Sequence, residues 1–289
     1  KNNLEGIAPL CGLHGHSNHY SMFVPGSRNL VAGHVDGDRR IMNRVYRIGQ
    51  IVPSSNVTME TEIPQIFRMR ETLYPERFTF HSSRMRMKKV TQDELAAMDA
   101  DSDRCALELS DAAVDVMGYA CLVAIMAMGL GYHRASQTRL EGVTENNGRP
   151  CPVVSSAGAL IQGLEFLSAK KIALITPYQK PLTDLVVNYI EAEGFEVMDA
   201  MSLEIPDNLE VAAQDPMQPA SLIDQLDLTG VDTIVASACV QMPSLPAVQA
   251  IQDQTGIQTL SASVATTHQM MKTLGLETNI PGVGALFSN

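Results

Sequence analysis

Two apolar segments that each contain an Ala-Cys pair constrain the fold of this chain more than any other feature. The first is VDVMGYACLVAIM, from Val114 to Met126, and the second is VDTIVASACVQMPSL, which begins at Val231. Each is typical of a short buried strand that passes into a helix, with Cys121 or Cys239 at the join. The two segments therefore predict an α/β fold with a thiol at each of two strand ends.

The rest of the chain repeats the same order of elements around these segments. Three pairs of positions match, each just after an apolar strand: Pro53 with Pro177, Cys121 with Cys239, and Ser155 with Ser261. Pro53 precedes Cys121 by 68 positions (121 − 53), and Pro177 precedes Cys239 by 62 (239 − 177). We interpret the halves as two pseudo-symmetric, doubly wound parallel-sheet lobes. Ligands bind beyond the carboxyl ends of such strands, so both thiols are expected in one cleft.

The lobes are expected to exchange their last segments. Residues 42–155 with 261–289 should form the first lobe, and residues 156–260 the second. Residues 1–41 hold four of the seven histidines and show no apolar periodicity, which predicts a flexible extension ahead of Met42. The HxHxxH run in this extension lies in a Gly- and Ser-rich stretch, so we expect no metal site there.

Composition excludes several classes of function. The formal net charge is −11, and the chain has no cluster of Lys and Arg of the kind that binds nucleic acid. Its one short basic run, RMRMKK at 84–89, is expected to be a solvated loop after a strand. The uncharged run from Val116 to Tyr132 is shorter than the roughly 20 residues of a membrane span and contains three glycines, so it should be core.

The five cysteines show no CxxC motif and no paired spacing, and we recognise no secretory signal. This pattern favours reduced thiols in a cytoplasmic protein. A single cysteine in an apolar strand is usually an inert core residue. Two at matched positions of a repeat favour a functional pair, Cys121 and Cys239, whereas Cys11, Cys105 and Cys151 are expected to be bystanders.

Four motifs together resemble a known enzyme family. They are GQIVPSSNVTMETE from Gly49 to Glu62, GYACLVA around Cys121, SACVQMPSL around Cys239, and the turn Pro177-Tyr178. In this order they resemble maleate cis-trans isomerases of the aspartate/glutamate racemase superfamily. The resemblance covers the chain from Met42 onward. It implies a cofactor-free enzyme with its active site between the two lobes, a small dicarboxylate substrate, no bound metal, and a homodimer or larger homo-oligomer.

The resemblance also implies roles for particular residues. By it, Cys121 is the nucleophile and Cys239 its acid/base partner. The substrate-binding positions that it implies are the side chains of Asn56, Tyr178 and Asn208 and backbone groups at Pro53, Leu122, Val123, Val240 and Gln241.

The residues suggest the same chemistry. Rotation about a carbon–carbon double bond requires that bond to become single, and addition of a thiolate achieves this without metal or flavin. Backbone N–H groups after each cysteine, with Asn56 and Tyr178, would stabilise the enediolate charge that develops. Since a free thiol has a pKa near ~8.5, we expect the helix N-terminus to lower the pKa of Cys121, while Cys239 stays protonated.

Three other functions remain open at this point. An amino-acid racemase of the same superfamily would use the two thiols to remove and return a Cα proton. An arylmalonate-type decarboxylase fits less well, because that family resemblance implies one catalytic cysteine. A non-catalytic binder of small diacids would have cysteines that only pack.

Overall fold

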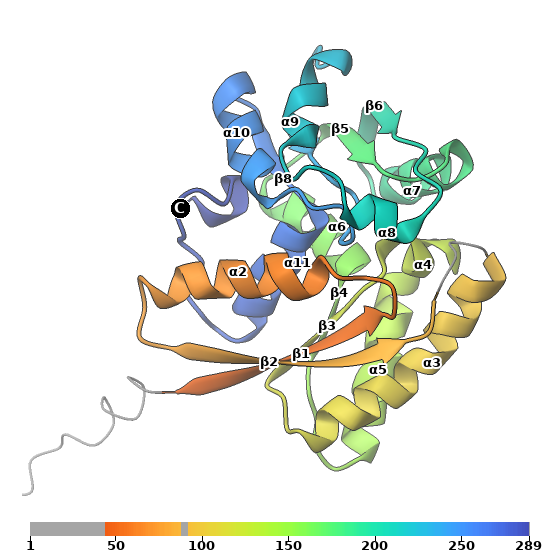
Figure 1. Cartoon of the computed structure of the whole chain (residues 1–289), viewed down its shortest axis with the longest axis vertical. Coiled ribbons are helices and arrows are strands. Elements are labelled where there is room, and N and C mark those ends of the chain that lie inside the picture. The colour runs from red at the N-terminus through yellow and green to blue at the C-terminus, as the bar shows by residue number, and fades with distance from the viewer. Residues whose placement is uncertain (1–43, 88–91, 289) are drawn as a thin grey trace, which may run out of the picture.

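The computed structural model describes residues 44–87 and 92–288 and contains two four-stranded parallel sheets (Figure 1). The strands of the first sheet are β1 (Val45–Pro53), β2 (Arg77–Met85), β3 (Val116–Tyr119) and β4 (Val153–Ser155). Those of the second are β5 (Lys171–Thr176), β6 (Glu196–Ser202), β7 (Thr233–Val235) and β8 (Gln258–Leu260). The spatial orders β2-β1-β3-β4 and β6-β5-β7-β8 are the same pattern. The predicted fold of two related, doubly wound lobes is confirmed.

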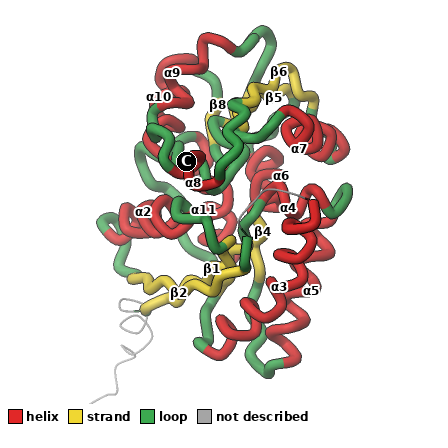
Figure 2. Tube along the Cα trace, turned by 45° about the vertical axis from the view of Figure 1, so that its right-hand side comes forward, coloured by secondary structure: helices red, strands yellow, loops and turns green. Residues whose placement is uncertain are grey.

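Helices cover the sheets and link them. They are α2 (Met59–Glu71), α3 (Gln92–Asp111), α4 (Leu122–Ala127), α5 (Tyr132–Asn146), α6 (Ser156–Phe166), α7 (Lys180–Ala192), α8 (Asn208–Ala212), α9 (Gln218–Leu222), α10 (Leu245–Thr255) and α11 (Ala262–Thr273), with short 3₁₀ helices η1 (Ile223–Gln225) and η2 (Ala285–Phe287). On the first sheet, α2 and α11 lie on one face and α3 and α5 on the other (Figures 1 and 2). The carboxyl ends of the strands in each sheet lie on the side that faces the other sheet (Figure 1).

The helices α6 and α11 leave β4 and β8 at equivalent places and pack against each other. Their contact is close because Gly163 has no side chain, and a Cβ at this position would lie 3.4 Å from that of Ala265. Both helices begin with a serine cap. The Oγ of Ser155 accepts from Gly158 N and that of Ser261 from Val264 N.

The loop predicted for the basic run begins later than expected, because its first two residues belong to a strand and only 86–87 of the described residues follow it. Arg84 and Met85 are the last residues of β2, and Met85 is fully buried. The Arg-Met alternation continues the two-residue period of the strand, so the methionines point inward and the arginines outward. The predicted capping residue Thr91, the lysines at 88–89 and the predicted extension 1–41 lie outside the described residues.

The strands before the two thiols end earlier than predicted. β3 ends at Tyr119 and β7 at Val235, so Cys239 lies in a loop rather than on a strand end. Asn208 begins α8, because Asp207 accepts hydrogen bonds from two N–H groups of its first turn. Residues 218–225 form the short helix α9 followed by η1.

Cys105, Cys121, Cys151 and Cys239 form no disulfide. Within 44–87 and 92–288, no helix combines the length and apolarity that a membrane crossing requires. The division of the chain between the two lobes stays a prediction.

Candidate active site

Both thiols of the predicted pair line one cavity between the two sheets. The residues around it are Pro53, Asn56, Met87, Cys121, Leu122, Val123, Tyr178, Asn208, Cys239, Val240 and Gln241. The structure thus brings together all ten predicted site residues and adds Met87. Their catalytic and binding roles stay predictions. Hollows of about 370 Å³, between α5 and α6, and about 400 Å³, near η2, contain no cysteine.

The cavity is narrow and nearly shut off from solvent, and we call this form the closed cavity. It offers about 20 Å³ to the centre of a water-sized sphere, enough for about one water molecule and too little for a four-carbon diacid. Cys121 is 9% exposed and Cys239 6%. A substrate therefore enters only if the surrounding segments move apart.

Cys121 stands at the N-cap of α4, and its side chain makes no capping hydrogen bond there. The backbone N–H groups of Ala124 and Val123, in the first turn of α4, act to lower the pKa of this thiol. Burial nevertheless raises the pKa of Cys121 to about 12, with a further contribution from Cys239, and the two N–H groups only oppose this rise. The predicted lowering of this pKa is wrong for the closed cavity, because desolvation of the thiolate outweighs the helix N-terminus.

Cys239 is held by the backbone around it. Its sulfur accepts from Gln241 N at 3.4 Å, and its carbonyl accepts from the Ser237 hydroxyl at 2.9 Å. Burial raises the pKa of Cys239, donors from Tyr178 and the following backbone oppose this, and the negative charge of Glu62 adds to the rise. Both thiols therefore favour the neutral form in the closed cavity.

Tyr178 follows β5 and its hydroxyl donates to Ala238 O at 3.3 Å. Burial raises the pKa of Tyr178 well above its usual value, with additional contributions from the two cysteines. The phenol therefore remains a neutral hydrogen-bond donor.

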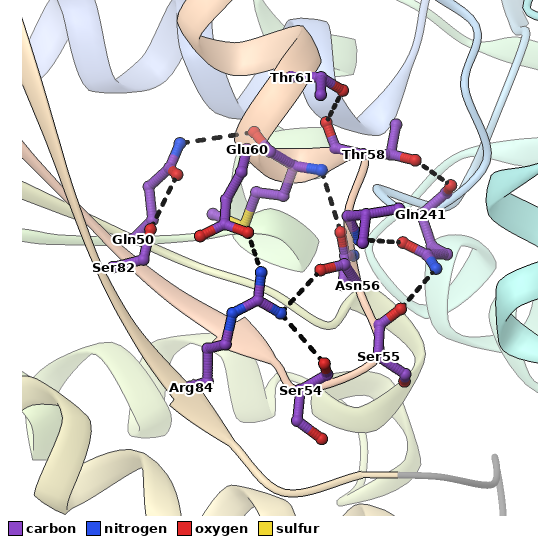
Figure 3. A network of polar contacts seen from close by, with 12 residues as sticks. Gln50, Ser54, Ser55, Asn56, Thr58, Glu60, Thr61, Ser82, Arg84 and Gln241 are labelled. Atoms are coloured by element: carbon purple, nitrogen blue, oxygen red, sulfur yellow. Dashed lines mark hydrogen bonds and ion pairs between the residues drawn. The ribbon is translucent and has the colours of Figure 1, made fainter.

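The side chain of Gln241 joins three segments of the site, and Figure 3 shows its bonds to the turn after β1. Its Oε1 accepts from Val57 N at 3.0 Å, and its Nε2 donates to Ser55 O at 2.9 Å and Asn208 O at 2.8 Å. Its backbone carbonyl accepts from the Thr58 hydroxyl at 2.6 Å. The sequence predicted only a backbone role for this residue, but its amide connects the Cys239 loop to the turn after β1 and to the start of α8.

The turn after β1 carries Asn56, whose Oδ1 accepts from Met59 N at 3.0 Å and so caps α2. This leaves the Nδ2 group as the donor that a substrate carboxylate can use. Arg84 braces the turn from β2, because its Nη1 donates to the carbonyls of Ser54 and Asn56, each at 3.0 Å, while its Nη2 pairs with Glu60 (Figure 3). Asn56 thus caps α2, and its role in substrate binding stays a prediction.

Asn208 reaches the same turn from the second lobe. Its Nδ2 donates to the Ser55 hydroxyl at 2.7 Å. Asn208 therefore bonds to protein in the closed cavity.

Met87 is the lining residue that the sequence interpretation missed. Its backbone N–H donates to the Ser54 hydroxyl at 3.0 Å, and the same hydroxyl donates back to its carbonyl at 3.1 Å. The signal was present in the Arg-Met alternation, since a continued two-residue period places Met85 and Met87 on the inner face.

The described lining is uncharged. None of the described residues around the cavity is an Asp, Glu, Lys or Arg. In the described part of the chain, no three His, Cys, Asp or Glu residues come together as a metal-binding group. The donors that the lining offers to an anion are backbone N–H groups, amides and a phenol.

Residues 48–287 match a family model described as arylmalonate decarboxylase. A maleate isomerase of Pseudomonas putida is 62% identical over 247 residues, which are 86% of this chain and 99% of that protein. The maleate isomerase of P. putida S16, solved as a cysteine-to-alanine variant with maleate, superposes with a TM-score of 0.83 at 62% identity, over 85% of this chain and 98% of that one.

A cysteine-to-serine mutant of the Nocardia farcinica maleate cis-trans isomerase carries a covalently bound succinylcysteine intermediate. It superposes with a TM-score of 0.80 at 45% identity, over 84% of this chain and 98% of that one. An arylmalonate decarboxylase structure at 19% identity, with a TM-score of 0.72, shares the fold. Sequence identity distinguishes between the two groups, since it is 45–62% to the isomerases and 19% to the decarboxylase. The chain belongs to the maleate isomerase family of enzymes, within the wider family that the arylmalonate decarboxylase model describes.

Proposed function

We propose that this chain converts maleate to fumarate through a covalent succinyl adduct on Cys121, with no cofactor. The observation that carries the proposal is that Cys121 and Cys239, from equivalent loops of two related lobes, line one uncharged cavity. Similarity to isomerases solved with maleate and with a succinylcysteine intermediate supports it. Cys121 is the candidate nucleophile and Cys239 the candidate acid/base.

Neutral donors suit a substrate with two carboxylates. One carboxylate would accept from Asn56 Nδ2 and from the N–H groups at the start of α4, and the other from Tyr178 and Asn208. For this, Asn208 gives up its bond to Ser55. A dipolar donor holds a carboxylate without a fixed ion pair, so that one carboxylate can rotate while the other stays bound.

The reaction begins with a Cys121 thiolate and a protonated Cys239. The thiolate forms a C–S bond to one alkene carbon, and the π electrons move into the carboxylate attached to the other carbon as an enediolate. Cys239 then gives its proton to that second carbon, which produces a succinyl adduct and a Cys239 thiolate. The former double bond is now single and rotates. Cys239 removes the proton again, the C–S bond breaks, and fumarate leaves with the thiolate of Cys121 restored.

The proposal places formation of the Cys121 thiolate in the open form of the site. Burial holds the pKa of this thiol at about 12 in the closed cavity, and contact with water removes most of that desolvation penalty. The N–H groups of Val123 and Ala124 then stabilise the anion as the site closes on the substrate.

The test combines turnover with mass spectrometry. Incubation of Cys239→Ser with maleate should accumulate protein heavier by one molecule of maleic acid, because the proton transfers that complete the cycle are slowed. Peptide mapping should place the added mass on Cys121. Turnover is followed by the ultraviolet absorbance difference between maleate and fumarate. The wild type should turn over maleate with no cofactor added, and Cys121→Ser should not turn it over.

Cys151→Ser is the matched control, because Cys151 is also a buried free thiol but lies outside the cavity. It should keep both turnover and adduct formation. Full activity of Cys121→Ser, or an adduct that maps to a different residue, would overturn the proposal. A homodimer or larger assembly and a cytoplasmic location stay predictions.

A further inference from the structure

Glu62 is a buried carboxylate next to the active site that the proposed reaction does not use. It lies on α2, is 5% exposed and does not line the cavity. Its Oε1 accepts from the backbone N–H groups of Ser244, at 2.5 Å, and Leu245, at 2.7 Å. Its Oε2 accepts from the hydroxyl of Ser263 on α11. A helix of the first sheet thus binds two segments that follow strands of the second.

The two N–H groups belong to the segment 239–245, which runs from Cys239 into α10. Ser244, the N-cap of α10, makes no capping bond with its own side chain. Glu62 supplies that cap from another helix, and a carboxylate is the favoured partner of a helix N-terminus. Thr58, the N-cap residue of α2, donates to Gln241 O. Glu62 and the N-cap residue of its helix therefore fix the segment just after Cys239.

The other half of the repeat has no such carboxylate. The helix equivalent to α2 is α7, and its buried residues are Thr183, Val186, Tyr189 and Ile190. Its one aspartate, Asp184, is exposed and pairs with Lys180. The thiols therefore occupy matched positions in the repeat, but in the described residues only the backbone after Cys239 is bound by a buried carboxylate. Asp99, the buried carboxylate near Cys121, bonds instead to side chains, those of Tyr119, Tyr132 and Arg139.

Three titratable groups act on Cys239: Cys121 across the cavity, Tyr178 after β5, and Glu62 behind the loop. Burial raises the pKa of Glu62, and its three donors oppose that rise because they bind the charged form. Ionised Glu62 in turn raises the pKa of Cys239, since two negative charges in a dry interior repel each other.

We propose that Glu62 is a positioning residue for Cys239: it fixes the segment 239–245 and keeps this thiol in the protonated form that donates a proton after the addition. This proposal rests on the proposed function only for the statement that Cys239 donates its proton to the substrate adduct. The duplicated fold places the two cysteines at equivalent positions, and Glu62 gives Cys239 a charged neighbour that favours its protonated form.

The test is the pH dependence of Cys239 alkylation in Glu62→Gln, measured with iodoacetamide and peptide mapping. Gln keeps the size of the side chain and an oxygen for the N–H groups of Ser244 and Leu245, but it removes the charge. Cys239 should react at lower pH, with a rate at mildly alkaline pH up to about tenfold above wild type, because one pKa unit is a tenfold change in thiolate. The alkaline limb of kcat/KM for maleate should move in the same direction.

Two further variants separate charge from loosened structure. Glu76→Gln removes a carboxylate that pairs with buried Arg70 near the other end of α2, so it should lower stability and leave the Cys239 profile unchanged. Glu62→Asp keeps the charge on a shorter side chain, and its profile should stay close to wild type while its melting temperature falls.

An unchanged Cys239 profile in Glu62→Gln would overturn the proposal. So would an equal shift in Glu76→Gln or in Glu62→Asp, because either would assign the effect to lost packing. Alkylation is measured without substrate, so its result is independent of maleate turnover. An unchanged Cys239 profile overturns the role of Glu62 even if maleate is turned over, and a shifted profile supports that role even if maleate is not turned over.

Discussion

The amide of Gln241 offers the sharpest test of how the closed cavity is held. Gln241→Ala removes three hydrogen bonds that join the Cys239 loop to Ser55, Val57 and Asn208. The bond from Thr58 to the backbone carbonyl at this position remains. The variant therefore unties the side-chain connection and leaves the backbone connection in place.

The expected loss follows from the burial of the groups involved. A typical hydrogen bond contributes about 1 kcal/mol net, so three give an upper figure of about 3 kcal/mol. Gln241 is 3% exposed, but its partners are only partly buried, and water can reach some of them once the side chain is gone. We expect a destabilisation of about 2 kcal/mol, which for a chain of this size lowers the melting temperature by roughly 4–8 °C.

The assay pairs thermal or urea unfolding with steady-state kinetics on maleate. The KM should rise and kcat/KM should fall by about tenfold or more, since about 1.4 kcal/mol of lost organisation corresponds to a factor of ten. Gln137→Ala is the matched control. The amide of Gln137 makes two hydrogen bonds, one donated to Val153 O and one accepted from the Ser155 hydroxyl, and the residue lies outside the cavity. It should lose comparable stability and keep the KM of the wild type.

Gln241→Glu tests the orientation of the amide. An oxygen in place of Nε2 would face the carbonyls of Ser55 and Asn208, so this variant should be no more stable than Gln241→Ala at neutral pH. If Gln241→Glu matches the wild type in melting temperature and KM, or if Gln241→Ala leaves both unchanged, the three-segment connection does not hold the site together.

Three other outcomes are expected. Met87→Ala should enlarge the cavity and raise the kcat/KM for methyl-substituted maleate relative to maleate, and an unchanged ratio would remove Met87 from the substrate wall. Burial raises the pKa of Cys151 to about 12 from an ordinary value of 9.0, so the folded state keeps this proton to a higher pH than the unfolded state does. The free energy of unfolding should therefore fall as pH rises above about 9, and it should fall less steeply in Cys151→Ala. Urea midpoints measured over this pH range will show the difference. Arg84→Lys keeps the charge but not the two carbonyl contacts, so KM should rise several-fold while stability changes by less than about 1 kcal/mol; an unchanged KM would mean that the turn carrying Asn56 needs no brace.

Much of the fold was predictable because its signals are local. The apolar runs before Cys121 and Cys239 and the serine at 261 each identify an element without reference to the rest of the chain. The matched order of those elements then predicted that the thiols meet. Their lining of one cavity follows from the geometry of parallel sheets, which places strand ends at one edge.

The predictions that failed depend on tertiary context. The pKa of Cys121 is raised because the closed cavity excludes water from the thiol, and no local sequence pattern reveals that burial. The roles of Glu62 and of the Gln241 side chain arise from contacts between positions that are far apart in sequence, as with the bond from Ser244 N to Glu62. The inner methionine at 87 was the exception, because the alternation that places it was visible in the sequence.

The packing of α6 against α11 has a consequence for how this molecule comes apart. Nine of the twelve residues of α11 are buried, and the helix lies against α2, β3 and β4 although it follows the last strand of the other sheet. The first sheet loses this cover if the chain is severed between β4 and β5, because α11 stays with the second sheet. Fragment 44–155, produced alone, should therefore be molten or insoluble, and the intact polypeptide should melt in one all-or-none transition rather than lobe by lobe.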